Sequence, residues 1–83
     1  MNRIDRIKQK LSVLKPSYLE IIDQSLLHAH HNGMNGKQET HISINISVDR
    51  LKQEPLIMQH RAINHLLKDE FNLGLHALKI VIV

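Results

Sequence analysis

Histidine side chains carry most of the chemistry that this chain could perform, since seven of its 83 residues are histidines. Three of them, His28, His30 and His31, stand close together in a segment that also holds Gly33 and Gly36. Neutral imidazole is a common ligand for iron, copper, nickel and zinc. A cluster of this kind is compatible with a metal site or with an ordinary solvated loop. The residues alone leave both interpretations open.

Few other side chains suggest a reaction. The sequence has no cysteine, which excludes disulfides and thiolate ligands from this chain. It contains no recognisable nucleophile–base motif and no phosphate-binding loop. Asp69 and Glu70 are adjacent on a predicted helix, so their carboxylates diverge and do not form a catalytic pair. We therefore expect a non-enzymatic protein.

The first element that the pattern predicts is an amphipathic helix. Its apolar stripe consists of Ile4, Ile7, Leu11 and Leu14. Asn2 is placed to cap its beginning, and Pro16 ends it. The cations Arg3, Arg6, Lys8 and Lys10 are predicted to form its solvated face.

Three strands and a second helix follow. Residues 18–24 indicate a strand, 25–39 a long loop, and 40–48 a second strand with alternating faces. The apolar face of the second strand is Ile42, Ile44, Ile46 and Val48. Its polar face, predicted to be solvated, is His41, Ser43, Asn45 and Ser47.

A polar turn, with a short helical turn near Leu51, leads to the second helix. Pro55 suits the first position of this helix, and Gly74 suits the position just past its end. The apolar residues at helical spacing are Ile57, Met58, Ala62, Ile63, Leu66, Leu67 and Phe71. Residues 75–83 are rich in β-branched side chains and predict a last strand.

The order α-β-β-α-β predicts one α+β domain over residues 1–83. The first two strands form an antiparallel hairpin, and the crossover helix makes the third strand parallel to the second. The result is a mixed three-stranded sheet with both helices on its apolar face. The end of the first strand and the start of the third then meet at one sheet edge. His28 and His76 are therefore expected to approach the same point.

Three ordered motifs resemble the BolA-like family. They are Asp23-x-Ser25-x-x-His28; Glu39-Thr40-His41; and His60-Arg61 leading through Glu70 to Leu75-His76-Ala77-Leu78. Family members usually have an aromatic residue at the place of Ile42 and often Arg at the place of Gln59, so the match is incomplete.

The resemblance implies a class II KH-like fold and a non-enzymatic adaptor. It implies binding to a monothiol glutaredoxin of the Cys-Gly-Phe-Ser type, with a [2Fe-2S] cluster shared between the two proteins and glutathione, for iron–sulfur trafficking or iron sensing. The family's ligand positions fall on His28 and His76, with His30 or His31 as loop substitutes. No cofactor is implied for the isolated protein, which is expected to be a monomer or weak homodimer.

A KH-like transcriptional regulator of stress response and cell morphology is the alternative. Its contacts with duplex DNA would come from Arg50, Lys52, Arg61 and Lys68. Gly33-Met34-Asn35-Gly36 spells the GxxG of RNA-binding KH domains, but here it joins two strands instead of two helices. The net charge of +3 favours neither function strongly. The lack of a signal peptide or membrane-length apolar run predicts a cytoplasmic protein, or an organelle-matrix protein after processing.

Overall fold

The computed structural model describes residues 1–25 and 40–83 of the chain. The described elements are α1 (Arg3–Leu11), the 3₁₀ helix η1 (Ser12–Leu14), β1 (Tyr18–Asp23), β2 (His41–Ser47), the 3₁₀ helix η3 (Asp49–Leu51), α2 (Leu56–Asn72) and β3 (Ala77–Ile82). The order is the predicted α-β-β-α-β, and η3 is the expected short helical turn near Leu51.

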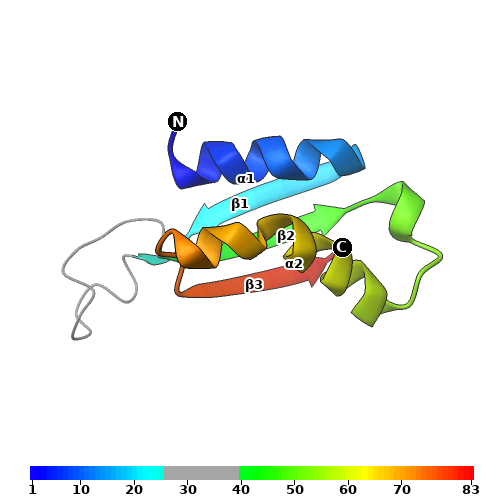
Figure 1. Ribbon diagram of the computed structural model, residues 1–83. Helices are drawn as coiled ribbons and strands as arrows, with labels where there is room; N and C mark the ends of the chain where they lie inside the picture. The colour runs from blue at the N-terminus through cyan, green and yellow to red at the C-terminus, as the bar shows by residue number, and fades with distance from the viewer. Residues whose placement is uncertain (26–39) are drawn as a thin grey trace.

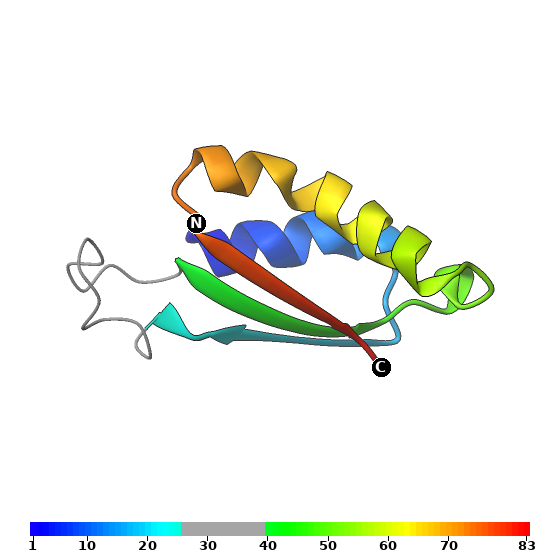
Figure 2. The same ribbon diagram turned by 90° about the horizontal axis from the view of Figure 1, so that it is seen from below.

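The three strands form one mixed sheet in the order β1-β2-β3. β1 pairs with β2 antiparallel, with Ile21 opposite Ile44, and β2 pairs with β3 parallel, with Ile44 opposite Ile80. Both helices lie on the same side of this sheet, as Figure 1 and, more plainly, Figure 2 show. The predicted α+β class, mixed sheet and one-sided helical layer are confirmed.

Among the described residues, the buried hydrophobic side chains between the helices and the sheet are all aliphatic. These core residues are Ile7, Leu11, Ile42, Ile44, Ile46, Val48, Ile63, Leu67 and Leu75. The central strand β2 supplies its predicted apolar face to this core, because alternate side chains of a strand point to one side.

Local signals set the ends of the two helices. The side chain of Asn2 accepts a hydrogen bond from the backbone N–H of Asp5 at 2.8 Å, which caps α1 as predicted. Past the end of α2, Gly74 adopts a φ of 113°, a conformation that side-chain-bearing residues rarely adopt. The N–H of Leu75 then donates to the carbonyl of Glu70 at 3.0 Å, which closes the helix and turns the chain toward β3. Pro55 lies one residue before the helix instead of at its first position.

Burial departs from the sequence pattern at two places. Ile57, Met58 and Phe71 are 58%, 45% and 44% exposed, because the sheet covers a narrower face of α2 than its apolar stripe. Ser43 and Ser47, placed on the solvated face of β2, are buried. On the central strand, Ser43 is paired with Ile22 of β1 and Lys79 of β3, and Ser47 is paired with Tyr18 of β1.

Two matched substitutions test the two faces of the sheet. Ile44 is fully buried, whereas Ile22, on the opposite face of β1, is 38% exposed. We expect Ile44→Val to lower the free energy of unfolding by about 0.5–1.5 kcal/mol, because it removes one buried methylene. Ile22→Val should cost less, and urea denaturation of both variants would measure the difference. Equal losses would contradict the assignment of the two faces.

No helix in the described part of the chain is long and apolar enough to cross a membrane.

Candidate functional site

His76 lies in the short connection between α2 and β3, directly before the strand that it was predicted to open. Its neighbour Leu75 is 3% exposed and anchors this connection in the core, while the His76 side chain is exposed. The backbone N–H of His76 donates to the carbonyl oxygen of Thr40 at 2.8 Å. The imidazole is therefore carried at the edge of the sheet where β2 begins and β3 follows.

A second histidine, His41, contacts His76 at this edge. The centroids of the two rings are 5.9 Å apart, and their planes are inclined by 53°. His41 is the first residue of β2 and is partly exposed. The sequence analysis placed His41 on the polar face of a strand and in the Glu39-Thr40-His41 motif, but it did not pair His41 with His76. The parallel register, which sets His41 opposite Ala77, brings it beside His76.

Thr40 ties the two histidines together. Its carbonyl oxygen accepts hydrogen bonds from the backbone N–H groups of His76, at 2.8 Å, and Ala77, at 3.1 Å. Its hydroxyl oxygen lies 3.1 Å from Nδ1 of His41. Thr40 is itself 4% exposed, so one buried residue contacts the imidazole of His41 and the backbone of His76.

The other predicted histidine ligands cannot be compared with this arrangement. His28, His30 and His31, together with the Gly33–Gly36 motif, fall within residues 26–39 and lie outside the described residues. Among residues 1–25 and 40–83, no group of three or more His, Cys, Asp or Glu side chains could hold a metal ion. His41 and His76 thus form a two-imidazole unit within the described structure.

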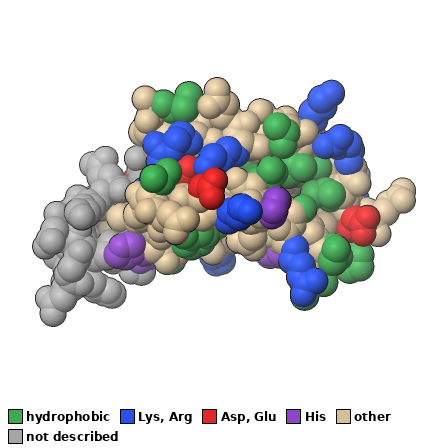
Figure 3. Space-filling view, viewed as in Figure 1, with side chains coloured by type: hydrophobic (Ala, Val, Ile, Leu, Met, Phe, Trp, Pro, Cys, Tyr) green, Lys and Arg blue, Asp and Glu red, His purple; other side chains and the backbone are tan. Residues whose placement is uncertain are grey.

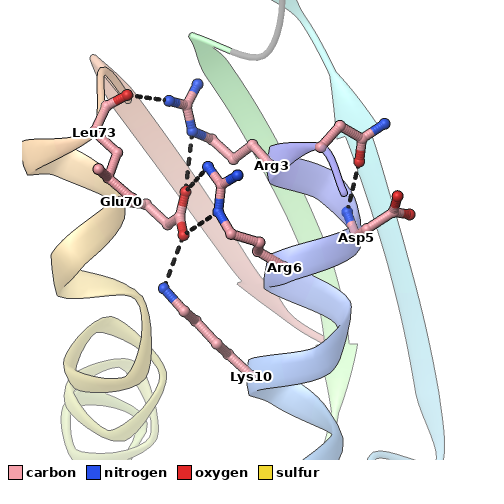
Figure 4. Close-up of polar contacts among 7 residues, drawn as sticks. Arg3, Asp5, Arg6, Lys10, Glu70 and Leu73 are labelled. Atoms are coloured by element: carbon pink, nitrogen blue, oxygen red, sulfur yellow. Dashed lines mark hydrogen bonds and ion pairs between the residues drawn. The ribbon is translucent and has the colours of Figure 1, made fainter.

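A buried ionic cluster joins α1 to the C-terminal end of α2, just before His76. Figure 4 shows Arg3, Arg6 and Lys10 of α1 converging on the carboxylate of Glu70, whose side chain is fully buried. Oε1 of Glu70 accepts from Arg3 at 3.1 Å and from Arg6 at 2.9 Å; Oε2 accepts from Arg6 at 3.1 Å and from Lys10 at 2.7 Å. In Figure 3, basic and acidic side chains also gather over the helical layer.

The cluster strongly favours the charged form of Glu70. Hydrogen bonds from Arg6 lower the pKa of this carboxyl from 4.5 to about 2, against the opposing effect of burial and with further help from Lys10. Arg3 also donates to the backbone carbonyl of Leu73. The ionic cluster therefore holds the turn that leads into His76.

This cluster corrects the sequence analysis at two points. The cations of α1 were predicted to be solvated, but Arg3 is buried, and Arg6 and Lys10 are partly buried against Glu70. Glu70 was considered only as a poor catalytic partner of Asp69. One available signal was its position in α2, since Ile63, Leu67 and Glu70 follow one another at helical spacing on the core side.

The four cations proposed for DNA contact lie in two separate regions, at η3 with the residue that follows it and on α2. Arg50 of η3 donates to the carbonyl of Val13 at 3.1 Å, and Lys52 pairs with Asp49 at 3.0 Å. Arg61 and Lys68 are exposed on α2, two helical turns apart. The Lys52 ammonium also lowers the pKa of the exposed Asp49 carboxyl through their hydrogen bond. Contact of this set with duplex DNA stays a prediction.

Comparison with known proteins identifies the same sequence family as the motifs. The family model for BolA-like proteins matches residues 11–83. The chain is 42% identical over 83 residues to the chloroplastic BOLA1 protein of Arabidopsis thaliana, covering 96% of this chain and 52% of that protein. It is 42% identical over 81 residues to the chloroplastic/mitochondrial SufE-like protein 1 of the same plant, covering 92% of this chain and 22% of that protein. The chain thus spans about half of the first relative and about a fifth of the second.

Solved structures agree with these matches. BolA1 from Arabidopsis thaliana superposes with a TM-score of 0.85 at 41% identity, covering 99% of this chain and 90% of that one. The BolA domain of SufE1 from the same plant gives 0.83 at 41% identity, covering 99% and 91%. Two of the relatives' names refer to chloroplasts or mitochondria, so a cytoplasmic location for this chain stays a prediction. The match over most of the chain, in sequence and in fold, shows that this chain belongs to the BolA-like protein family.

Proposed function

We propose that this chain is a non-enzymatic adaptor that binds a monothiol glutaredoxin and supplies imidazole ligands to a shared [2Fe-2S] cluster. The observation that carries the proposal is the placement of His76. Its ring is exposed, while its backbone is fixed by Thr40 and by the buried Leu75. A ligand on a rigid support loses little freedom when it binds, which favours a defined ligand geometry.

The donor set of the chain fits this role. Because the sequence has no cysteine, it can offer such a cluster imidazoles but no thiolates. A glutaredoxin cysteine and the thiol of glutathione would supply two thiolates, and two histidines of this chain would complete four ligands. His76 is one ligand in this proposal, and His28 of the loop, with His30 or His31 as substitutes, is the other.

Imidazole ligation would give the shared cluster distinct properties. Replacing a thiolate by a neutral imidazole removes negative charge from the cluster and raises its reduction potential, as in Rieske centres. A cluster held partly by this chain should therefore be easier to reduce than one held by glutaredoxin and glutathione alone. A higher reduction potential of the shared cluster suits a role in cluster trafficking or iron sensing.

Reconstitution with a partner tests the proposed function. We expect this chain, mixed with a monothiol glutaredoxin, glutathione, Fe²⁺ and sulfide, to form a one-to-one complex. Its visible circular dichroism should differ from that of the cluster-bridged glutaredoxin homodimer. Size-exclusion chromatography with iron and sulfide analysis gives the stoichiometry. A spectrum that stays that of the glutaredoxin homodimer at every ratio of the two proteins would contradict the proposal.

The same preparation distinguishes the DNA-binding alternative. A regulator that contacts phosphates should be retained on duplex DNA at low salt and released steeply as salt rises. Such retention, without any iron-dependent complex with glutaredoxin, would favour the regulator. Absence of retention at low salt would remove direct DNA contact.

A further inference from the structure

We infer that two copies of this chain associate through β3, edge to edge and antiparallel, into a two-fold symmetric dimer with one continuous sheet. Within the described residues, β3 is the last strand of the sheet and β2 is its one hydrogen-bonded neighbour. The other side of β3 therefore presents backbone N–H and C=O groups that a further strand can pair with. Such a dimer needs no glutaredoxin, glutathione or metal ion, so it goes beyond the proposed function.

The hydrogen bonds of β3 to β2 identify which backbone groups are open. The N–H of Val83 donates to the carbonyl oxygen of Ile46 at 2.9 Å. Because the backbone groups of successive strand residues point to alternate sides, Leu78, Ile80 and Ile82 direct theirs away from β2. All three residues are partly exposed. Their backbone is what a second strand would meet.

The two edges of the sheet differ in how they discourage pairing with another chain. β1, at the opposite edge, carries the carboxylates of Glu20 and Asp23. Charged side chains and prolines are the usual protection of an edge strand. The sequence of β3, ALKIVI, has no proline and a single charge, that of Lys79. The β3 edge is therefore the one suited to accept a strand, and its aliphatic character favours an aliphatic partner.

One flank of α2 adds apolar surface above the same edge. Ile63 and Leu67 are fully buried toward the sheet, and Glu70 faces α1 (Figure 4). Phe71 follows Glu70 by about 100° of helical turn, which places it on the side of α2 away from α1, over β3. Phe71 is 44% exposed, and Ile57, on the same flank, is 58% exposed. In an antiparallel pair of edges, this flank of one copy lies next to the same flank of the other.

Pairing of β3 with a copy of itself has a favourable register. With Ile80 on the two-fold axis, Leu78 lies opposite Ile82 of the second copy, so every open residue meets an open residue. Lys79 then lies opposite Val81 of the second copy, which keeps the two ammonium groups apart. With the axis at Lys79 instead, the two lysines would face each other directly, which is unfavourable. The chain thus supplies in β3 a strand that matches its own edge.

Sedimentation equilibrium of the isolated chain tests the association. EDTA is present and the chain has no polyhistidine tag, so that metal ions cannot bridge histidines. An edge of 6 residues is a small contact. Because it falls below the roughly 1,200 Å² of a stable interface, we expect a reversible dimer with a dissociation constant on the order of 0.1 mM. A chain that stays monomeric at about 1 mM would overturn the proposal.

Nuclear Overhauser effects between two copies test the register. In a non-hydrogen-bonded antiparallel pair the Cα atoms are about 4.5 Å apart, so Hα of Lys79 should show a strong effect to Hα of Val81 in the second copy. Within one strand, residues two apart are separated by about 6.6 Å. Isotope-filtered spectra of mixed labelled and unlabelled chains record the contact between copies alone. A dimer without this contact would contradict the pairing through β3.

Opposite charges at residue 81 provide a matched pair of variants. Val81→Glu places a carboxylate opposite Lys79 of the second copy, and Val81→Lys places an ammonium group there. At low salt, the dissociation constant should be about tenfold lower for Val81→Glu than for Val81→Lys. Ile22→Glu and Ile22→Lys make the same changes of net charge on the same sheet face at the β1 edge, and should differ much less. Thermal melts at dilute concentration check that each variant is folded.

Equal dissociation constants for the two variants at residue 81, or a tenfold difference only between the two at residue 22, would overturn the assignment to β3. No glutaredoxin is present in these measurements, so their outcome is independent of whether the shared cluster forms.

Discussion

Replacing Glu70 by alanine is expected to lower the free energy of unfolding by about 3–5 kcal/mol, because it leaves three clustered cations without their anion. Arg3, Arg6 and Lys10 would remain close together on a partly buried surface without the carboxylate that binds all three. The change also removes the link between α1 and the end of α2. Chemical denaturation monitored by circular dichroism would measure the loss. In a domain of this size such a loss is a large part of the total stability.

The same carboxylate should make the protein sensitive to acid. The pKa of Glu70 is lowered from 4.5 to about 2 in the folded state, so the unfolded chain takes up its proton first as the pH falls. The stabilisation from this group is therefore complete above about pH 5 and is lost as the pH falls toward 2, by about 3 kcal/mol in total. Glu70→Gln, which keeps the shape but not the charge, should be less stable at pH 7 and lose stability less steeply below pH 5.

A neighbouring carboxylate provides the control for both measurements. Asp69 is exposed on the same turn of α2, and Asp69→Ala should change the free energy of unfolding by no more than about 0.5 kcal/mol. If Glu70→Ala were as stable as Asp69→Ala, the ionic cluster would contribute nothing to the fold.

His76→Ala is expected to abolish the visible circular dichroism signature of the mixed cluster while leaving the apo protein folded. The side chain is exposed, so its removal creates no cavity in the core. The backbone bond from His76 to Thr40 is kept in the variant. Loss of the signature would therefore report loss of a ligand and not loss of structure. Reconstitution with glutaredoxin, glutathione, iron and sulfide would measure it, beside a thermal melt of the apo protein.

Two further variants calibrate this result. His65→Ala removes an exposed imidazole from α2 and should leave the spectrum unchanged. His28→Ala should weaken the cluster less than His76→Ala, since His30 and His31 stand nearby in the sequence as substitutes. A wild-type spectrum from the His76→Ala variant would end the assignment of His76 as a ligand.

The sequence predicted the features of the fold that depend on residues close together in the chain. The alternation of apolar and polar residues predicts β2, and the helical spacing of apolar residues predicts α1. The glycine after α2 marks the helix end, because the backbone there has a positive φ. Together with the strand directions, they placed His76 at the correct edge of the sheet. The topology of a short α-β-β-α-β chain leaves few other arrangements.

The parts that were missed depend on contacts between distant residues. Glu70 and Arg3 are 67 residues apart, and although helical spacing places Glu70 on the core side of α2, no local pattern identifies Arg3 as its partner. His41 and His76 come together only through the exact pairing of β2 with β3, which the alternating pattern does not specify in one-residue detail. Exposure of Ile57 and Met58 likewise depends on where the sheet ends beneath α2, and helical spacing carries no information about that.

The position of Arg3, Arg6 and Lys10 determines which fragments of this domain keep the ionic cluster. The family match begins at residue 11, after Arg3, Arg6 and Lys10. A fragment trimmed to that boundary would keep the Glu70 carboxylate and lose every cation that contacts it in the described structure. A fragment that includes α1 is therefore expected to be more stable than one that begins at residue 11. A protease nick or a rigid fusion that displaces this leading helix would be transmitted to the turn that carries His76, at the opposite end of the sequence.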